Sequence, residues 1–381
     1  MSITTLLSDC LDFFREKKVH KRFTLQWHIT EKCNLECSHC YEIFKNRPEA
    51  DISLVHLALS QFNELLSQYQ TLKHSIKIFG HINLTGGEPL LHPNFWEIIK
   101  LIKNQPDRRY SWGLLTNGTL IDAAMARKIA DENPALVQIS IDGKEETHDR
   151  IRGMGSFNRA VAGVKNLVQT GIRPIISFTA SSENYLEFPQ VVELANRIGA
   201  RKVWSDRYLP MKKDPAQPEF LNRGQTDKFF SLMRQERCQA RNNQQRAVVE
   251  MNRALQFLKT ETRPYRCNAG RWLLCLQADG TLLPCRRLPI ELGNIKEHEI
   301  SKIYFNNSFI KQLKEPELFP EECRPCRFRY QCGGGLRCLS AAVHGDPFRR
   351  DPGCWMDFTD QKQVNLSKNR FISSNCEASL W

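Results

Sequence analysis

The clearest chemical signal in the sequence is a group of three cysteines, Cys33, Cys37 and Cys40, that lie within eight residues. Three thiolates at this spacing can ligate three irons of a [4Fe–4S] cube, and the fourth iron then has no protein ligand. Clusters that are held by four cysteines usually carry electrons, whereas an iron with an open position can bind and activate a substrate. The spacing therefore indicates a catalytic iron–sulfur cluster.

A zinc knuckle or scattered core cysteines are the alternatives for these three residues, and disulfide bonding is the alternative for the 14 cysteines of the chain as a whole. Zinc requires four ligands and usually a second CxxC pair some distance away. His39 could supply a fourth ligand, but it lies between two of the cysteines in a tight loop. Disulfides are typical of secreted proteins, and the N-terminus has no basic residues before its first apolar residues, as a signal peptide would.

Four further motifs follow the cysteines, each at or near the end of an expected strand. They are Gly86-Gly87-Glu88-Pro89, Thr116-Asn117-Gly118, Ser140-Ile141-Asp142-Gly143 and the stretch 148–153. Glycines let a ligand approach the backbone closely, a carboxylate can accept a hydrogen bond from an ammonium group, and an arginine can bind a carboxylate through two parallel hydrogen bonds. Taken singly, each motif could be an ordinary polar strand end.

In this order, the cysteines and the motifs resemble those of the radical S-adenosylmethionine (radical SAM) family over residues 23–210. The resemblance implies that the open iron binds the amino acid end of S-adenosylmethionine, and that the strand end with Glu88 holds its amino group. Ser140 and Arg152 are implied to contact its carboxylate and ribose side, and Asn184 is a further candidate. The implied cofactor-binding residues are Tyr41, Gly86, Gly87, Glu88, Thr116, Asn117, Ser140, Asp142 and Arg152.

Eight more cysteines lie between residues 267 and 354, in a region that is rich in glycine and poor in long apolar runs. Such a region needs metal to hold it together. The order of the cysteines resembles the SPASM extension, which binds auxiliary [4Fe–4S] clusters in peptide-modifying radical SAM enzymes. The resemblance implies one cluster on Cys267, Cys275, Cys285 and Cys338, and a second on Cys323, Cys326, Cys332 and Cys354. The rival is a zinc ribbon, but Cys323 and Cys326 form the only CxxC pair in this region.

The sequence departs from the family pattern at two places. The gap between Cys332 and Cys338 is longer than usual, with Leu336 in the usual cysteine position, and Cys338 is expected to substitute. Sulfatase-maturing relatives place an aspartate, acting as a base, directly after the cysteine that matches Cys285, whereas this chain has Arg286 and Arg287. A guanidinium does not accept a proton at neutral pH. The reaction is therefore expected to differ, and Arg286 is a candidate for contact with a substrate carboxylate or for neutralising the cluster charge.

The elements that must position these residues alternate between strands and helices. Strands are expected at 23–30, 81–85, 111–116, 137–141, 174–179 and 202–206, with helices at 54–69, 95–103, 123–131, 157–169 and 191–198. Six such steps predict an α/β fold, a partial (β/α)6 TIM-like barrel followed by a small cysteine-rich SPASM domain. The cysteine loop and the glycine turns then lie at the C-terminal ends of the strands, where such barrels place their active sites.

The expected domain boundaries follow from changes in composition. They are an N-terminal helix at 1–22, the radical SAM partial barrel at 23–210, a linker and helices at 211–266, the SPASM domain at 267–360 and a polar tail at 361–381. Two helices are expected within 223–258. Strand one begins near residue 23, which leaves no room for a leader-peptide recognition domain before the barrel.

Charge and hydropathy narrow the possible partners. The net charge of +12 favours an acidic partner, although the basic residues are spread along the chain and nucleic-acid binding is not expected. No apolar run approaches the roughly 18–20 residues of a membrane span, and a cytoplasmic location is expected. Brown colour in an anaerobic preparation would separate an iron–sulfur enzyme from the rival class, a zinc-containing nucleic-acid-binding protein.

The expected function is reductive cleavage of S-adenosylmethionine to a 5′-deoxyadenosyl radical that abstracts hydrogen from a substrate C–H bond. The favoured outcome is oxidative modification or cross-linking of a ribosomally made peptide, and the alternative is modification of a small molecule such as a sugar or a tetrapyrrole. The expected cofactors are S-adenosylmethionine, one [4Fe–4S] cluster that binds it and two auxiliary [4Fe–4S] clusters. The expected partners are the substrate, a reductant such as flavodoxin or ferredoxin, and a separate leader-peptide recognition protein as one option.

Overall fold

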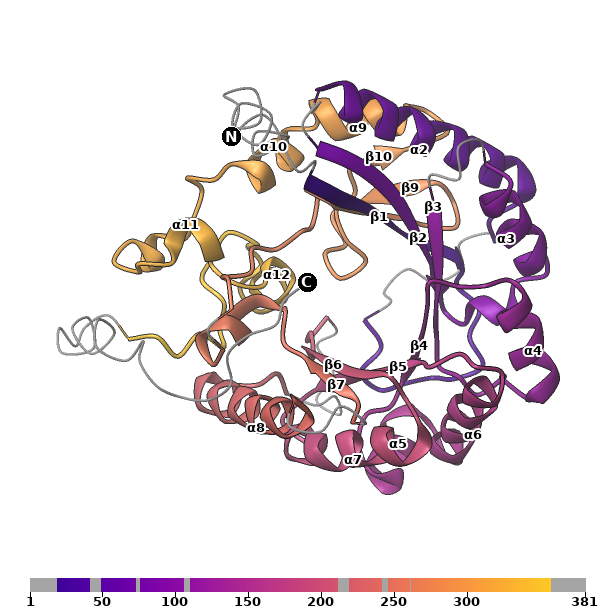
Figure 1. Ribbon diagram of the computed structural model, residues 1–381. Coiled ribbons are helices and arrows are strands. Elements are labelled where there is room, and N and C mark those ends of the chain that lie inside the picture. Colours follow the sequence, from indigo (N-terminus) through magenta and orange to yellow (C-terminus); the bar gives the residue numbers. More distant parts are fainter. Residues whose placement is uncertain are drawn as a thin grey trace, which may run out of the picture.

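Seven parallel strands form the wall of an open, curved barrel (Figure 1). The computed structural model describes residues 19–41, 49–72, 76–105, 110–211, 219–241, 246–260 and 262–357. The strands are β1 (Val19–Thr30), β2 (Ile76–Gly86), β3 (Tyr110–Thr116), β4 (Leu136–Ser140), β5 (Ile175–Ala180), β6 (Lys202–Arg207) and β7 (Val248–Glu250). Each strand pairs in parallel with the next one along the chain. The expected α/β partial barrel is confirmed.

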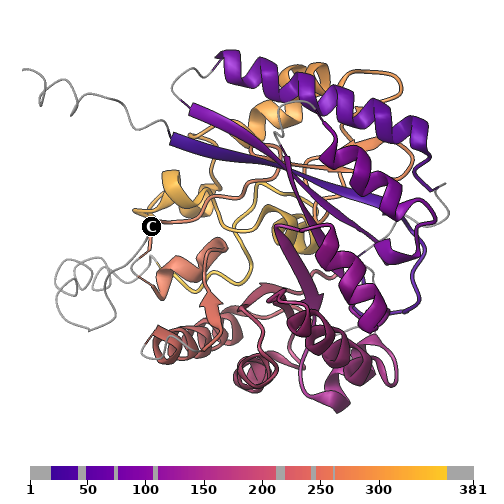
Figure 2. The same ribbon diagram turned by 45° about the vertical axis from the view of Figure 1, so that its right-hand side comes forward.

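Helices cover the outside of this wall (Figures 1 and 2). They are α2 (Ile52–Leu72), α3 (Phe95–Lys103), α4 (Ala123–Asp131), α5 (Glu145–Arg152), α6 (Ser156–Gln169), α7 (Phe188–Ile198) and α8 (Arg223–Arg241). In α2 the buried apolar residues recur at helical spacing, as in Leu54, Ala58, Phe62 and Leu65, so that one stripe faces the sheet. Within the described part of the chain, no helix is long and apolar enough to cross a bilayer.

Strand β1 separates the core from the interior of the barrel. Phe23, Leu25, Trp27 and Ile29 are fully buried among the core residues beneath the helices. Because side chains alternate between the two faces of a strand, the residues between them, such as Gln26, point to the opposite face and line the barrel interior. The cysteine loop begins directly after this strand, so the core packing of β1 fixes where the loop starts.

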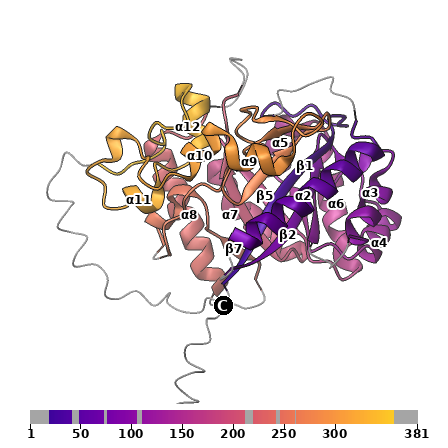
Figure 3. The same ribbon diagram turned by 90° about the horizontal axis from the view of Figure 1, so that it is seen from above.

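The C-terminal segment extends the sheet at the free edge of β1. Strand β8 (Leu273–Leu276) runs parallel to β1, with Cys275 opposite Gln26. Strands β9 (Thr281–Leu283) and β10 (Gly293–Asn294) follow in antiparallel pairing, which completes a ten-stranded sheet. The remaining helices are α9 (Ile300–Asn306), α10 (Ser308–Lys314), α11 (Arg329–Cys332) and α12 (Arg337–His344). Seen from above, α10, α11 and α12 lie on the far side of the molecule from α3 and α4 (Figure 3).

Two elements differ from the sequence expectation. The second helix expected within 223–258 is wrong: after α8 the chain forms β7 and then a 3-10 turn at Ala254–Leu258. Val248 and Val249 are β-branched residues that favour a strand, and β7 pairs with β6 at the free edge of the sheet. Helix α5 was not anticipated, and it contains most of the 148–153 motif. The N-terminal helix expected at 1–22 is wrong for residues 19–22, which belong to β1 because they pair with β2. The rest of that segment and the tail from 361 lie outside the described residues.

Candidate active site

The three-cysteine loop follows the C-terminal end of β1. The backbone N–H of Cys40 donates to the carbonyl of Cys37 at 3.1 Å, which makes the loop a tight turn. The pKa of Cys37 is raised to about 11, chiefly by burial and also by the nearby thiols of Cys40 and Cys33, and the Arg152 guanidinium opposes this rise. The three thiols are therefore close enough to repel one another when ionised, and a positively charged iron centre would relieve that repulsion.

The Gly-Gly turn at the end of β2 packs directly on the chain that leads into this loop. A Cβ atom on Gly86 would lie 2.1 Å from the carbonyl oxygen of Thr30, and one on Gly87 would lie 2.3 Å from that of Lys32. The N–H groups of Gly87 and Glu88 donate to these same two carbonyls, at 2.9 and 2.8 Å. The glycines are needed here for close backbone approach, and they hold the base of the cysteine loop against β2.

Glu88 joins this turn to the Thr-Asn-Gly turn that follows β3. Its buried carboxylate accepts hydrogen bonds from the Thr116 hydroxyl at 2.8 Å and the Asn117 backbone N–H at 2.9 Å. Burial raises the pKa of Glu88 to about 7, although these hydrogen bonds favour the ionised form. The Asn117 side chain in turn donates to Asn34 Oδ1 at 2.9 Å and lies 4.0 Å from Cys33 Sγ. Two motifs that are distant in sequence thus meet at the cysteine loop.

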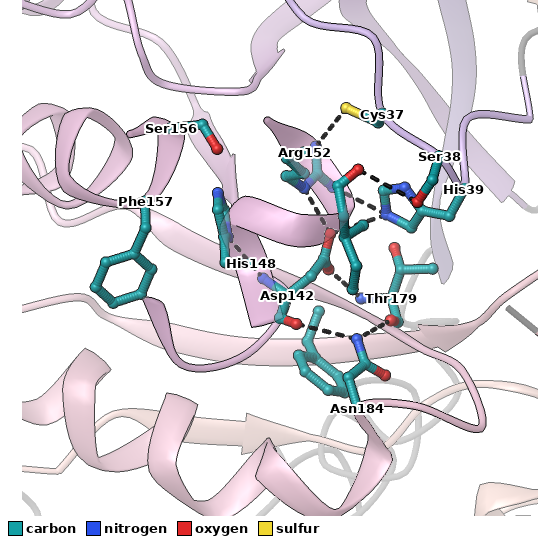
Figure 4. Close-up of polar contacts among 12 residues, drawn as sticks. Cys37, Ser38, His39, Asp142, His148, Arg152, Ser156, Phe157, Thr179 and Asn184 are labelled. Carbon is teal, nitrogen blue, oxygen red and sulfur yellow. Dashed lines mark hydrogen bonds and ion pairs between the residues drawn. The ribbon is translucent and has the colours of Figure 1, made fainter. Parts of the chain in front are cut away.

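Asp142 and Arg152 contact the cysteine loop at Cys37 and His39 (Figure 4). Asp142 is fully buried, and its Oδ2 lies 2.9 Å from His39 Nε2 and accepts from Arg152 Nε at 2.5 Å. Arg152 Nη1 lies 3.9 Å from Cys37 Sγ. Ser140, at the end of β4, is half-buried and paired in register with Ser177 of β5.

Asn184 has a structural position in this network. Its side-chain amide donates to the carbonyls of Asp142 and Thr179, and its oxygen accepts from the backbone N–H of Ser181 at 2.8 Å. These bonds tie the ends of β4 and β5 together. They leave Asn184 little capacity for the cofactor contact that its place after a strand suggested.

The C-terminal cysteines fall into two groups. Cys338 is fully buried, which raises the pKa of its thiol, the Arg287 guanidinium lowers it, and the thiols of Cys267 and Cys285 raise it again. Cys275 lies on β8 opposite Gln26, and the side-chain oxygen of Gln26 accepts from Cys285 Sγ at 3.8 Å. Cys338, Cys267 and Cys285 therefore lie near one another, and Cys275 lies on the strand beside Gln26, which contacts Cys285. That these four cysteines hold one cluster stays a prediction.

The second group lines a common cavity. The cavity is bounded by Cys323, Cys326, Cys332 and Cys354, by apolar side chains that include Leu255, Phe257 and Phe328, and by Arg350. The pKa values of Cys323 and Cys332 are both raised to about 12, chiefly by burial and in part by the nearby thiol of Cys354. Four thiols around an apolar cavity that Arg329 and Arg350 also line fit a thiolate-ligated iron–sulfur cube, whose negative charge a guanidinium would offset.

The bonding state of the cysteines bears on the alternatives raised by the sequence. All twelve cysteines in the described ranges are free of disulfide bonds. Across the same ranges, no three His, Cys, Asp or Glu side chains converge closely enough to hold one metal ion. Each thiolate of a [4Fe–4S] cube binds a different iron, so its sulfurs need not converge on one atom as the ligands of zinc do. The spread of the thiols is compatible with clusters.

The two arginines after Cys285 have different surroundings. Arg287 is buried, forms an ion pair with Asp206 at the end of β6 and donates to the carbonyl of Arg207. The Arg286 backbone N–H donates to the side-chain oxygen of Gln26 at 3.3 Å, and its guanidinium lies 5.7 Å from the ring centre of Tyr41. Its Nε is buried and has no hydrogen-bond partner among the described residues. The side chain of Arg287 is thus bound to the barrel, whereas that of Arg286 faces Tyr41, the residue that follows Cys40.

Comparison with known proteins agrees with this architecture. The family model of the Radical SAM superfamily matches residues 27–195, and that of the SPASM iron-sulfur cluster-binding domain matches residues 267–327. The AdoMet-dependent heme synthase of Methanosarcina barkeri is 26% identical to this chain, over 87% of this chain and 95% of the relative. The mycofactocin maturase MftC of Mycobacterium tuberculosis is also 26% identical, over 86% and 80% of the two chains.

Solved structures with the same fold include two radical SAM proteins. That of anSMEcpe with bound AdoMet and the Cp18Cys peptide has a TM-score of 0.70 at 18% identity, covering 91% of this chain and 99% of that chain. That of SuiB from Streptococcus suis bound to the precursor peptide SuiA has a TM-score of 0.62 at 14% identity, covering 93% and 80%. Likeness at these identities concerns the fold alone.

A parallel α/β barrel with a three-thiol loop at its C-terminal edge and a cysteine-rich extension defines an iron–sulfur enzyme of the radical SAM type. This chain carries a radical SAM domain at residues 27–195 and a SPASM iron–sulfur cluster-binding domain from residue 267. Its cofactors are [4Fe–4S] clusters and S-adenosylmethionine.

Proposed function

We propose that this protein oxidatively modifies a ribosomally made peptide by removing a hydrogen atom from an unactivated C–H bond. The observation that carries the proposal is the position of Arg286. It follows the candidate auxiliary ligand Cys285, and its guanidinium lies over Tyr41, which follows Cys40 of the first cluster loop. A substrate between these two segments would contact both the radical source and a group that can accept its second electron.

In this proposal, the cysteine groups bind the clusters and Glu88 binds S-adenosylmethionine. Cys33, Cys37 and Cys40 hold the first cluster, and Glu88 receives the amino group of S-adenosylmethionine. When bound, this cluster and S-adenosylmethionine supply the 5′-deoxyadenosyl radical that takes a hydrogen atom from the substrate. The two C-terminal cysteine groups hold auxiliary clusters, whose class spans potentials of roughly −700 to +450 mV. A reductant such as flavodoxin or ferredoxin supplies the first electron.

The peptide substrate is supported by the name of one relative, a mycofactocin maturase, and by a fold shared with a protein solved with its precursor peptide. A second candidate, a tetrapyrrole, is supported by the names of other relatives, which are heme and Fe-coproporphyrin III synthases. Arg286 suits a carboxylate in either case, because its guanidinium can form paired charge-assisted hydrogen bonds with one.

The experiment uses the anaerobically reconstituted full chain with S-adenosylmethionine and a reductant. Short peptides encoded beside the gene form one arm, and iron coproporphyrin III forms the other. The expected result is 5′-deoxyadenosine above the substrate-free rate and a mass change in a peptide only. A mass change in the porphyrin only would replace the peptide proposal with the tetrapyrrole one, and no product in either arm would count against both substrates.

Metal analysis tests the cofactor part independently of the substrate. Three sets of cysteines imply about twelve irons per chain if each holds a [4Fe–4S] cube. Replacing Cys33, Cys37 and Cys40 together by Ala should remove about four irons and abolish cleavage of S-adenosylmethionine. An iron content near four in the unmodified chain would show that the C-terminal cysteines hold no clusters. Undiminished cleavage in the triple variant would refute the assignment of the first cluster.

A further inference from the structure

Asp142, one of the residues that the resemblance implied for cofactor binding, is a fully buried group whose carboxylate oxygens are already occupied by protein donors. Its Oδ2 is shared by His39 Nε2 and Arg152 Nε, and its Oδ1 accepts from the Thr179 backbone N–H at 2.7 Å. Its own backbone N–H donates to His148 Nδ1 at 3.1 Å. The carboxylate therefore connects β4, β5, α5 and the cysteine loop, and Figure 4 shows it at the centre of these contacts.

The hydrogen-bond partners of Asp142 favour the ionised form of its carboxylate. Burial alone would raise the pKa of Asp142, but the Arg152 guanidinium and His39 hold it well below its usual range. An ionised carboxylate only accepts hydrogen bonds, so the proton of His39 must be on Nε2. The 3.5 Å approach of Arg152 Nη2 to that nitrogen is then a contact between two donors that share one acceptor.

Three consecutive residues of the cysteine loop are attached to this side of the barrel. Cys37 Sγ lies 3.9 Å from Arg152 Nη1, and the Ser38 backbone N–H donates to the Ile151 carbonyl at 2.8 Å. His39 is bound to Asp142, as described above. The segment between the second and third cysteines is thus fastened to the last turn of α5 and to the end of β4.

We propose that Asp142, His39 and Arg152 form a positioning network for the first cluster. Asp142 fixes the loop through His39 and orients the Arg152 guanidinium at the Cys37 sulfur. A permanent positive charge beside a ligating thiolate favours the more negative, reduced cluster, since hydrogen bonds to sulfur and local charge set cluster potentials. Arg152 and Asp142 act through Cys37 in this proposal, rather than as contacts to the carboxylate of S-adenosylmethionine.

The proposal depends on the cluster but not on the identity of the substrate, so its test omits substrate. The full chain is reconstituted and the cluster whose EPR signal changes on addition of S-adenosylmethionine is titrated. Three quantities are measured: its midpoint potential, the rate at which a chelator removes its iron, and the affinity for S-adenosylmethionine. The variants are Arg152→Gln, Arg152→Lys, Asp142→Asn and His39→Ala.

In Arg152→Gln the midpoint potential should become more negative and iron removal should be about 10–100-fold faster, the usual effect of losing a group that supports a metal ligand. Arg152→Lys keeps the charge and should recover most of the potential. Asp142→Asn and His39→Ala should also speed iron removal. The matched control is Arg150→Gln, on the same helix but exposed and paired with Glu183, which should leave all three quantities unchanged.

Two results would overturn the proposal. One is a normal potential and normal iron retention in Arg152→Gln with weakened binding of S-adenosylmethionine, which would return Arg152 to a cofactor-contact role. The other is unchanged iron retention in both Asp142→Asn and His39→Ala. If Asp142→Asn does not fold, His39→Ala and Arg152→Lys leave the backbone bonds of Asp142 intact and decide the question. None of these results depends on whether a peptide or a tetrapyrrole is the substrate.

Discussion

At the scale of residues, the site is built from polar side chains that satisfy one another before any cofactor is bound. Glu88, Thr116 and Asn117 form one such group, and Asp142, His39 and Arg152 form another. Side chains that are held in this way are pre-organised, so that they lose little rotational freedom when a ligand arrives. The first group contacts the loop at Cys33 and Asn34, and the second contacts it at Cys37 and His39.

The raised pKa of Glu88 predicts that the affinity for S-adenosylmethionine depends on pH. Its pKa of about 7 lies above its ordinary value of 4.5. If the ionised carboxylate receives the amino group of S-adenosylmethionine, affinity for the cofactor should fall about tenfold for each pH unit below 7. Calorimetric titration at about pH 6 and about pH 8 measures this slope. Glu88→Gln should lose the slope, and equal slopes in the two proteins would contradict the assignment.

The raised pKa of Glu88 also makes the free energy of unfolding depend on pH. Between pH 4.5 and about 7 the carboxyl group of Glu88 is protonated in the folded protein and ionised in the unfolded one. The folded state then binds more protons, so the contribution of Glu88 to the free energy of unfolding falls as the pH rises through this window.

The arginines after Cys285 lead to a second prediction. Arg286→Gln should weaken substrate binding by about 1.5–3 kcal/mol, the usual loss for a hydrogen bond to a charged group, and leave iron content and substrate-free cleavage unchanged. Arg287→Gln leaves Asp206 without its partner in a mostly buried place. The Arg287→Gln variant should be destabilised by about 3 kcal/mol and should lose auxiliary iron.

For Arg286→Gln, loss of iron with intact substrate affinity would show that Arg286 supports the cluster rather than the substrate.

At the scale of elements, the ends of strands β1 and β2 decide where the cysteine loop lies. The two strands pair in parallel along their whole length and stay in contact through the Gly-Gly turn. Helix α5 approaches the loop from the opposite side through Ile151 and Arg152. The loop is therefore held between two elements rather than by its own few hydrogen bonds.

This arrangement predicts the effect of adding one methyl group. Gly87→Ala would place a carbon 2.3 Å from the Lys32 carbonyl oxygen. The loop must then shift, and the variant should lose about 1–3 kcal/mol of stability, as overpacked sites do, together with iron of the first cluster. Gly224→Ala is the control, because its nearest neighbour is 3.6 Å away. Unfolding curves and iron content measure both, and similar values for the two variants would contradict the prediction.

At the scale of the whole molecule, the cysteine-rich C-terminal region is attached to the barrel at two places. Strand β8 adds to the edge of β1. Near the other edge, Arg207 at the end of β6 forms two hydrogen bonds with Asp351, at 2.8 and 2.5 Å, and both side chains are fully buried. Asp351 also accepts from the backbone N–H groups of Leu336 and Gly353. These bonds connect the barrel to the cysteine-rich chain around the second cavity.

Breaking this pair should therefore have a large effect. Asp351→Asn leaves the Arg207 charge buried without its counterion and should cost about 3–5 kcal/mol of stability, with loss of auxiliary iron. Glu322→Gln removes an exposed partner of Arg349 nearby and should cost at most about 1 kcal/mol. Chemical denaturation and iron analysis compare them. A cost in Asp351→Asn no larger than that in Glu322→Gln would show that the pair does not hold the domains together.

The sequence by itself determined the class of the enzyme and most of its local structure. The three-cysteine spacing and the order of the later motifs indicated the radical SAM and SPASM domains. Helices α3 and α4 begin and end at the residues predicted. Such features are local, because the positions of ligands and of apolar stripes are set by residues a few places apart.

Only the tertiary structure decided which polar groups meet. Asp142 and His39 are 103 residues apart, and Arg207 and Asp351 are 144 apart, so their pairing depends on strand register and on where β8 joins the sheet. For the same reason β7 formed where a helix was expected, since the open edge of β6 offered a partner to Val248 and Val249. The difference between Arg286 and Arg287, neighbours of the same type, likewise arises because one side chain reaches Asp206 and the other faces Tyr41.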